Sequence, residues 1–433
     1  MRQLFVHFFV CSIFCSVMPV SALSFGDTIK TTLAGEIKSG ITVSDFEHNS
    51  IQSEFKESVW YDSGMNLRVK TRTFFNENLD FTCHYLLLSS WGDSAQSSRF
   101  FEQKYPGSIS SQIFKRKFEN DNTSLIDLSS QIKQGQDSLA YHRLDRFNLS
   151  IDNNFGRVVL GRQATTWGNG LVFNPMDIFN PFSPYDSDRD YKQGEDLAYF
   201  ETFFNNGDDL QLLYVPRRDL EDGDIKFSES SIAAKYHLYL DNLELDFMTS
   251  KHYEDIVTGL GLVRTVKNAV LRSDVIYTFA GGDMEEDFLS FIINMDYSWI
   301  WFKKNFYGLI EYHYSGIGID NDYSTIFTDY DISTRISRGE IYGLGVNYLN
   351  SNLQIEINPL LNFNVLIIAN INDPSYLIQP LFTYSILQNL EVKFGANVAV
   401  GGRDDEYGQI EIPFSSKTKD FGSNAFIWVT KFF

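Results

Sequence analysis

The stretch Asn424-Ala-Phe-Ile-Trp-Val-Thr-Lys-Phe-Phe433 decides the predicted fold, because it is an aromatic-rich strand that ends the chain on phenylalanine. An unprotected hydrophobic edge invites aggregation in a soluble protein, whereas in a closed barrel the last strand pairs with the first and no edge remains. We therefore predict a barrel that closes by pairing this strand with residues 31–43.

The alternation within this last strand leaves two interpretations of its lipid-facing side. Successive residues of a strand point to opposite faces, so only one of the two sets can face lipid. One set is Ile427, Val429 and Phe433, with Lys431 reaching to the periplasmic interface; the other is Phe426, Trp428 and Phe432.

The first residues have the pattern of an export signal. One arginine precedes an apolar run, and the run ends in Val20-Ser-Ala22, whose small residues suit signal peptidase. We expect a signal peptide of residues 1–22 and a barrel of residues 23–433. Cleavage would leave Cys83 as the one cysteine, so the exported chain could form no internal disulfide.

The composition argues for a membrane barrel and against several other classes. After the signal, no stretch reaches the roughly 18 uncharged apolar residues of a membrane helix. The mean hydropathy of -0.20 resembles that of a soluble protein, but a barrel also gives such a value because apolar and polar residues alternate along its strands. The net charge of -20 argues against nucleic acid as a partner.

Period-two segments of about ten residues recur along the chain, as membrane-spanning strands require. Clear examples are residues 66–73, 232–238 and 289–301. In the first, Leu67, Val69 and Thr71 form one face and Arg68, Lys70 and Arg72 form the other.

The connections between these segments alternate between short and long, which fits short periplasmic turns and long external loops. Eight short turns contain Asn, which tolerates tight turns, and they give 18 strands of an antiparallel up-and-down barrel. The strand signals in residues 353–387 are weak, and if that stretch is not a pair of strands the barrel has 16. A soluble sandwich or propeller is the alternative, but no repeat of 40 to 50 residues supports a propeller.

The short turns lie near 76–78, 153–156, 205–208, 241–242, 267–268, 303–305, 350–352 and 388–389. Apart from a tight link near 254–255, the long connections are 44–63, 91–137, 167–196, 217–227, 281–287, 317–338, 364–375 and 401–423.

A barrel of 16 to 18 strands is too wide for side chains to fill, so the residues that line or block the lumen decide its function. Opposed arcs of charge would orient dipolar solutes and select ions by sign. The alternative is that charges of both signs are scattered over the wall, which is then polar because it contacts water but does not select ions. The strand parities place Arg68, Lys70, Arg72 and Arg146 in a basic arc and Glu244, Asp246, Glu311, Glu356 and Glu391 in an acidic one, which Arg272 and Lys393 interrupt.

The third external connection, 167–196, is the most distinctive segment. Three of the ten prolines stiffen it, so we expect it to be ordered. Gly161-Arg-Gln163 before it resembles porins, whose third loop commonly folds inward. The run from Trp167-Gly-Asn-Gly170 through Asn180-Pro-Phe-Ser-Pro184 is similar to uncharacterised proteobacterial barrels, some of them like alginate-export proteins. We therefore predict that Arg162, Asp177, Asp186, Asp188, Asp190 and Glu195 lie near a constriction; the alternative is an external acidic loop bridged to lipopolysaccharide by divalent cations.

An enzymatic interpretation rests on His313-Tyr-Ser315, which has the spacing seen in outer-membrane phospholipases and lipid A deacylases. A dyad that attacks lipid must face the bilayer. Here the apolar alternation of the strand turns His313 and Ser315 toward the lumen, together with Glu311. We therefore expect no enzyme, and the remaining histidines and the 186–197 acidic run lack the ligand patterns of a metal site.

Together these features predict a porin-like channel in the outer membrane of a Gram-negative bacterium, with the third loop narrowing the lumen. Diffusion through such a lumen requires no cofactor. The alternatives are an exit port for a polysaccharide or lipid exporter of the inner membrane, and a lipid hydrolase. Expected partners are outer-membrane lipids, lipopolysaccharide and the barrel assembly machinery; the sequence leaves the oligomeric state open.

Overall fold

The structure is a computed structural model that describes residues 22–25, 29–105, 121–187, 190–220, 222–284 and 286–433. The predicted signal peptide lies outside these residues, apart from Ala22. None of the helices in these ranges is long and apolar enough to span a membrane.

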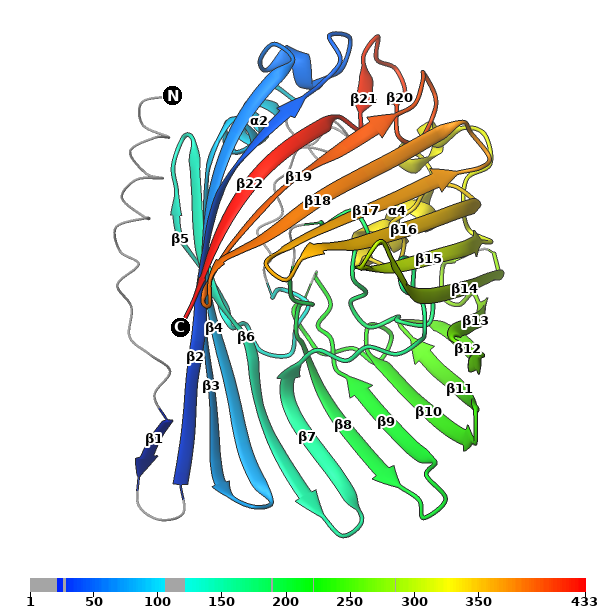
Figure 1. The fold of residues 1–433 in the computed structure, drawn as a ribbon. Helices are drawn as coiled ribbons and strands as arrows, with labels where there is room; N and C mark the ends of the chain where they lie inside the picture. The colour runs from blue at the N-terminus through cyan, green and yellow to red at the C-terminus, as the bar shows by residue number, and fades with distance from the viewer. Residues whose placement is uncertain (1–21, 26–28, 106–120, 188–189, 221, 285) are drawn as a thin grey trace.

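Among the described residues, eighteen strands form one closed antiparallel barrel, which confirms the predicted count over the alternative of 16 (Figure 1). Chain neighbours pair with each other around the ring, as in an up-and-down barrel. The strands are β2(Ile29–Asp45), β3(Val59–Asn76), β4(Leu79–Gly92), β6(Ser138–Asn153), β7(Gly156–Gln163), β8(Glu195–Phe203), β9(Asp209–Val215), β10(Ser231–Leu240), β11(Leu243–His252), β12(Asp255–Val266), β13(Ala269–Phe279), β14(Phe288–Trp301), β15(Lys304–Ser315), β16(Asn347–Asn358), β17(Leu361–Asn370), β18(Ser375–Leu387), β19(Leu390–Val400) and β22(Ser423–Phe432).

The barrel closes where β22 pairs with β2, as the terminal stretch predicts. The register runs from Glu36 opposite Phe432 to Asp45 opposite Ser423. At the end of this seam, the backbone N–H groups of Gly35 and Phe433 each donate to the other's carbonyl, at 2.8 and 2.9 Å. No edge of the last strand is left open there, because β19 pairs with its other side.

The burial pattern settles which side of β22 faces outward. Ile427 is 41% exposed, while Phe426 and Trp428 are buried inside the barrel. Lys431 lies on the outward side, and its Nζ donates to Asn389 Oδ1 in the β18–β19 turn at 2.7 Å. The parity with Ile427 and Val429 toward lipid is therefore correct.

Two predicted connections are misplaced. Residues 350–352 lie within β16, and the turn to β17 comes at residues 359–360; the predicted connection 364–375 shrinks to 371–374. The asparagines responsible point inward instead of forming a turn. Asn350 is fully buried, and Asn364 Nδ2 donates across the strand pair to Asn352 Oδ1 at 2.8 Å.

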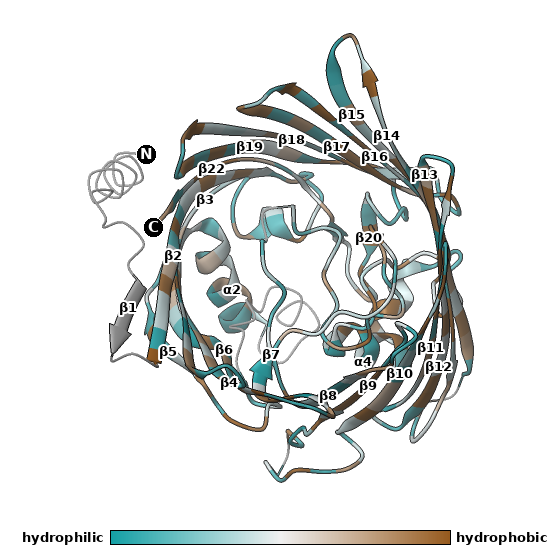
Figure 2. Ribbon diagram, turned by 60° about the horizontal axis from the view of Figure 1, so that its bottom comes forward, coloured by the Kyte–Doolittle hydropathy of each residue, from teal (hydrophilic) through white to brown (hydrophobic). Residues whose placement is uncertain are grey.

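The long external connections carry short elements that the sequence did not predict. They include α2(Asp93–Lys104), η1(Gln52–Glu54), β5(Ser129–Gln134), η2(Tyr323–Phe327), α4(Tyr330–Arg338), β20(Gln409–Glu411) and β21(Thr418–Asp420), while β1(Ala22–Phe25) pairs with β2. Figure 2 shows α2 and α4 within the outline of the ring of strands.

Candidate functional site: the segment between β7 and β8

The segment that joins β7 to β8 lies against inward-facing side chains of distant strands. On β15, the buried Glu311 carboxylate accepts three backbone N–H groups, from Leu171 at 2.9 Å, Val172 at 3.2 Å and Phe173 at 2.8 Å. On β13, Asp274 accepts the N–H of Asn169 at 2.5 Å. Backbone donors that lack partners within the loop thus bind carboxylates of the wall, which fixes this part of the segment.

Apolar side chains of the same segment pack against an apolar part of the inner wall. Trp167 and Phe179 meet edge to face, with ring centroids 5.5 Å apart, and Met176 is fully buried beside them. Trp167 Nε1 also donates to Gln211 Oε1 on β9 at 2.7 Å. The wall residues in this cluster are Leu197, Leu213, Val215, Ala233, Met248, Val257 and Ile276. The inner wall from β8 to β13 is therefore a packing surface as well as a polar lining.

A buried ion pair closes the segment on itself. Lys192 Nζ donates to both carboxylate oxygens of Asp177, at 2.6 and 2.7 Å. Burial raises the pKa of Asp177 to about 6, although the Lys192 ammonium acts in the opposite direction. Asp177 is 3% exposed. This predicted constriction residue therefore stabilises the conformation of the segment and does not line the open lumen.

The end of the segment near β8 is held by basic residues on the opposite side of the barrel. Asp190 pairs with Lys38 on β2 at 3.0 Å and with Lys393 on β19 at 2.6 Å. Burial acts to raise the pKa of Asp190, but these two ammonium groups hold it below its ordinary value. The Tyr191 hydroxyl donates to Glu36 and accepts from Lys70, at 2.8 and 2.5 Å. The segment is therefore tied to the wall on both sides of the lumen.

The predicted basic arc faces inward, but most of its charges are paired. Asp145 accepts from Arg68 at 2.7 Å and from Arg146 at 2.8 Å. Arg72 makes a two-pronged contact with Asp80, at 2.9 and 3.0 Å. The Arg72 side chain is 44% exposed, whereas that of Arg68 is 6% exposed. Arg72 is thus also paired, but its side chain is far more exposed than that of Arg68.

The remaining predicted residues have other positions. Arg162 is fully buried and bridges Asp196, at 2.8 Å, to Asp121. Glu195 is the first residue of β8 and pairs in register with Gln163. Asp186 lies in a turn, where its N–H donates to the Ser183 carbonyl at 3.3 Å. Asp188 lies outside the described residues.

Another buried carboxylate, that of Glu406, joins three external connections and was missed by the sequence analysis. It accepts from the Tyr348 hydroxyl at 2.6 Å, from Asn370 Nδ2 at 2.8 Å and from the Leu344 N–H at 2.7 Å. The Tyr185 hydroxyl, from the β7–β8 segment, lies 3.4 Å away. Burial raises the pKa of Glu406 to about 7. No sequence spacing signals this cluster, because its members come from four separate parts of the chain.

His313 and Ser315 face the interior, as the alternation in β15 predicts. The His313 ring is buried and stacks on Phe173 and Tyr348, with centroids 4.5 and 5.8 Å away. No hydrogen bond joins His313 to Ser315 in the described structure, and no group of three metal-binding side chains occurs in the described ranges. This geometry gives no support to a lipid-facing hydrolytic pair.

Comparison with solved structures finds porin-like barrels. Acinetobacter baumannii OccAB3 matches with a TM-score of 0.53 and 10% identity, over 93% of this chain and 99% of that one. A BenF-like porin from Pseudomonas fluorescens Pf-5 matches with a TM-score of 0.50 and 10% identity, over 93% and 98%. Pseudomonas aeruginosa OccK3 (OpdO) matches with a TM-score of 0.48 and 12% identity, over 93% and 95%. No protein-family model and no curated protein matches the chain.

At these identities the likeness concerns the fold. Neither OccAB3 nor the BenF-like porin supports the resemblance to alginate-export proteins. By fold, the chain is a porin-like β-barrel of 18 strands in a Gram-negative outer membrane.

Proposed function

We propose that the protein is a passive channel for small hydrophilic solutes, with the 167–196 segment narrowing its lumen. The observation that carries this proposal is the attachment of the segment to separate strands around the ring, through Glu311 on β15, Lys393 on β19 and Lys38 on β2. An 18-stranded barrel encloses more space than its wall side chains fill, so a fixed internal segment sets the width of the path.

The accessible charges near this segment give the path its selectivity. Arg72 and Lys70 have side chains that are 44% and 25% exposed, whereas the acids beside them, Asp80 and Glu36, are covered. Exposed cations beside a narrow aqueous path attract anions and repel cations. The channel therefore favours small anions, and no residue of the path needs to react with the solute.

Conductance in a planar bilayer tests the proposal. We expect stepwise conductance from the purified protein, larger steps after deletion of residues 170–190, and a reversal potential that shifts toward cations in Arg72→Glu. Heat-modifiable migration on a denaturing gel would verify that each variant is a folded barrel. Folded protein that conducts neither with nor without residues 170–190 would refute the channel.

A further inference from the structure

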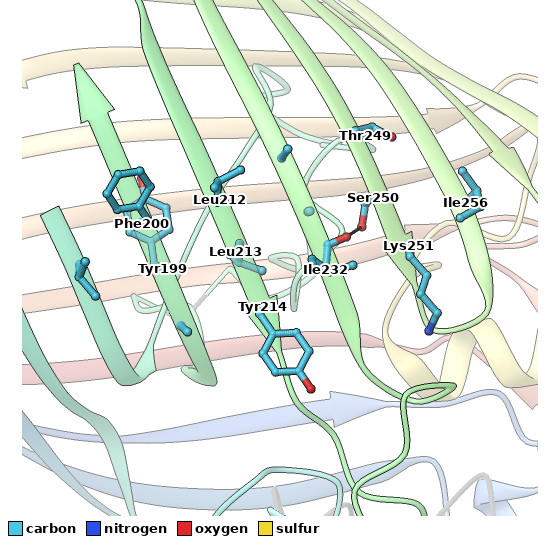
Figure 3. A pocket seen from close by; sticks show the side chains of 14 residues that line it. Tyr199, Phe200, Leu212, Leu213, Tyr214, Ile232, Thr249, Ser250, Lys251 and Ile256 are labelled. Atoms are coloured by element: carbon cyan, nitrogen blue, oxygen red, sulfur yellow. Dashed lines mark hydrogen bonds between the residues drawn. The ribbon is translucent and has the colours of Figure 1, made fainter. Parts of the chain in front are cut away.

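The lipid-facing wall carries two adjoining apolar grooves near its external rim. One, of about 470 Å³, crosses β7 to β12, and the other, of about 460 Å³, crosses β4 to β9. They share Ala198 and Tyr214, so they meet at these two side chains. Figure 3 shows the first groove, with Tyr214 and Lys251 at the same end of it.

Strand register explains why the first groove is concave. One row across the strands is Ala198, Tyr214, Ile232, Lys251 and Ile256, and the next row is Phe200, Leu212, Ala234 and Thr249. Each row therefore holds one alanine among larger side chains, Ala198 in the first row and Ala234 in the second. Leu212 and Ile232 are 41% and 50% exposed and stand out from the wall, whereas the short alanine side chains leave the wall lower beside them.

Lys251 is an unusual residue for this wall, because it points outward beside Ile232 and Ile256. A lysine on the lipid face is costly at the middle of the bilayer but not at its interface. Its Nζ donates to the Phe227 carbonyl and, at 3.2 Å, to the Ser230 carbonyl, and it lies over the Phe227 ring. An ammonium group has three donors, so these two carbonyls leave one for an anion.

Two external connections overhang the grooves and are joined to each other. Arg218 donates to the Leu125 carbonyl through Nε and Nη2, at 3.1 and 2.9 Å, and its N–H donates to Thr123 at 2.8 Å. Ile126 and Phe227 of these connections are 47% and 65% exposed. Apolar groups at this height lie at the level where lipid headgroups meet acyl chains.

We propose that the two grooves bind acyl chains of a phosphorylated glycolipid of the outer leaflet, lipid A, with a phosphate on Lys251 and the Tyr214 hydroxyl. Two adjoining apolar grooves below one accessible cation match a lipid with several chains and an anionic headgroup. Glu229 and Glu254 lie near Lys251 and suit the divalent cations that bridge such phosphates. A second barrel would present a convex wall and would leave the gaps at Ala198 and Ala234 unfilled.

Native mass spectrometry with bisphosphorylated lipid A, added to delipidated protein, tests this site. Ala234→Phe fills the first groove and should weaken lipid A binding at least tenfold. Ala425→Phe makes the same change on the outward side of β22 and should leave binding unchanged. Lys251→Met should weaken binding several-fold and should abolish the preference for bisphosphorylated over dephosphorylated lipid A.

Heat-modifiable migration would verify that every variant is folded, and unchanged conductance would show that the channel itself is intact. Equal lipid A binding by the wild type, Ala234→Phe and Lys251→Met would overturn the proposal. Equal affinity for phosphatidylglycerol and lipid A would also overturn it, because the grooves would then bind any anionic lipid. A wild-type dimer in place of a lipid-bound monomer would overturn it too, because a second barrel would then occupy the grooves.

Discussion

Glu311 on β15 accepts the backbone N–H of Phe173, 138 residues earlier in the chain, at 2.8 Å. The same carboxylate also accepts the N–H groups of Leu171 and Val172. A buried carboxylate with three backbone donors is well solvated by them, so it holds the turn in one conformation. This contact links the wall of the barrel to the segment that joins β7 to β8.

Glu311→Gln should loosen this turn, because a neutral amide is a weaker acceptor for three donors. We expect a loss of about 2 kcal/mol in local stability, which corresponds to roughly thirtyfold faster amide exchange at Phe173. Hydrogen exchange with mass spectrometry on the reconstituted barrel measures it. Glu356→Gln is the matched control, since Glu356 accepts from Asn305 on the neighbouring strand. Unchanged exchange in Glu311→Gln would contradict this role.

The Glu406 cluster should loosen as the pH rises. Burial raises the pKa of Glu406 to about 7 from an ordinary value of 4.5, so the folded cluster holds its proton more tightly than the open one. Its stability is full below about 4.5 and falls as the pH rises through about 7. The open-channel noise in conductance traces, recorded from pH 4 to 8, should increase over this window. Glu406→Gln should flatten the dependence; a wild type that is insensitive to pH would contradict it.

The closing seam depends on a glycine. A Cβ on Gly40 would lie 2.4 Å from the Ile427 carbonyl oxygen and 2.5 Å from the Trp428 ring, and the backbone atom cannot move aside. Gly40→Ala should therefore destabilise the barrel by about 1–3 kcal/mol. Denaturant unfolding in detergent measures this, with Ser39→Ala on the same strand as control. Equal midpoints for the two variants would show that the seam tolerates a side chain.

Asp190→Asn should make the lumen more positive. Asp190 pairs with both Lys38 and Lys393, so its removal leaves two ammonium groups without this carboxylate. The reversal potential in a potassium chloride gradient should move toward chloride. Glu77→Gln changes the same charge in a periplasmic turn and should have little effect. A shift toward potassium in Asp190→Asn would contradict the proposed anion preference.

The strands were predictable from the sequence because their signals are local. Alternation in residues 66–73 fixes which side faces the lumen, and the terminal stretch identifies the seam with β2. The turn predicted at 350–352 is misplaced, but the predicted number of strands is still correct. The true turn, at residues 359–360, connects the same two strands, β16 and β17. The sequence therefore predicts the number of strands more reliably than the position of each turn.

The lumen was less predictable, because its contacts join residues far apart in the chain. Asp190 meets Lys38 across 152 positions, and Tyr185 meets Tyr407 across 222. The sequence did hold a signal for α4, since the Asp329 side chain caps its first turn and Gly339 ends it with a φ of 75°. The inner apolar cluster around Met176 had no such signal, because a polar lumen was expected there.

Single-channel conductance of the wild type and of the double variant Glu311→Gln, Asp274→Asn tests the central claim most directly. Both carboxylates bind the backbone of the 167–196 segment on one wall, so their neutralisation should release it. We predict small, steady steps for the wild type and larger, noisier steps for the folded double variant. Identical conductance in the two proteins would contradict the claim that this segment narrows the lumen.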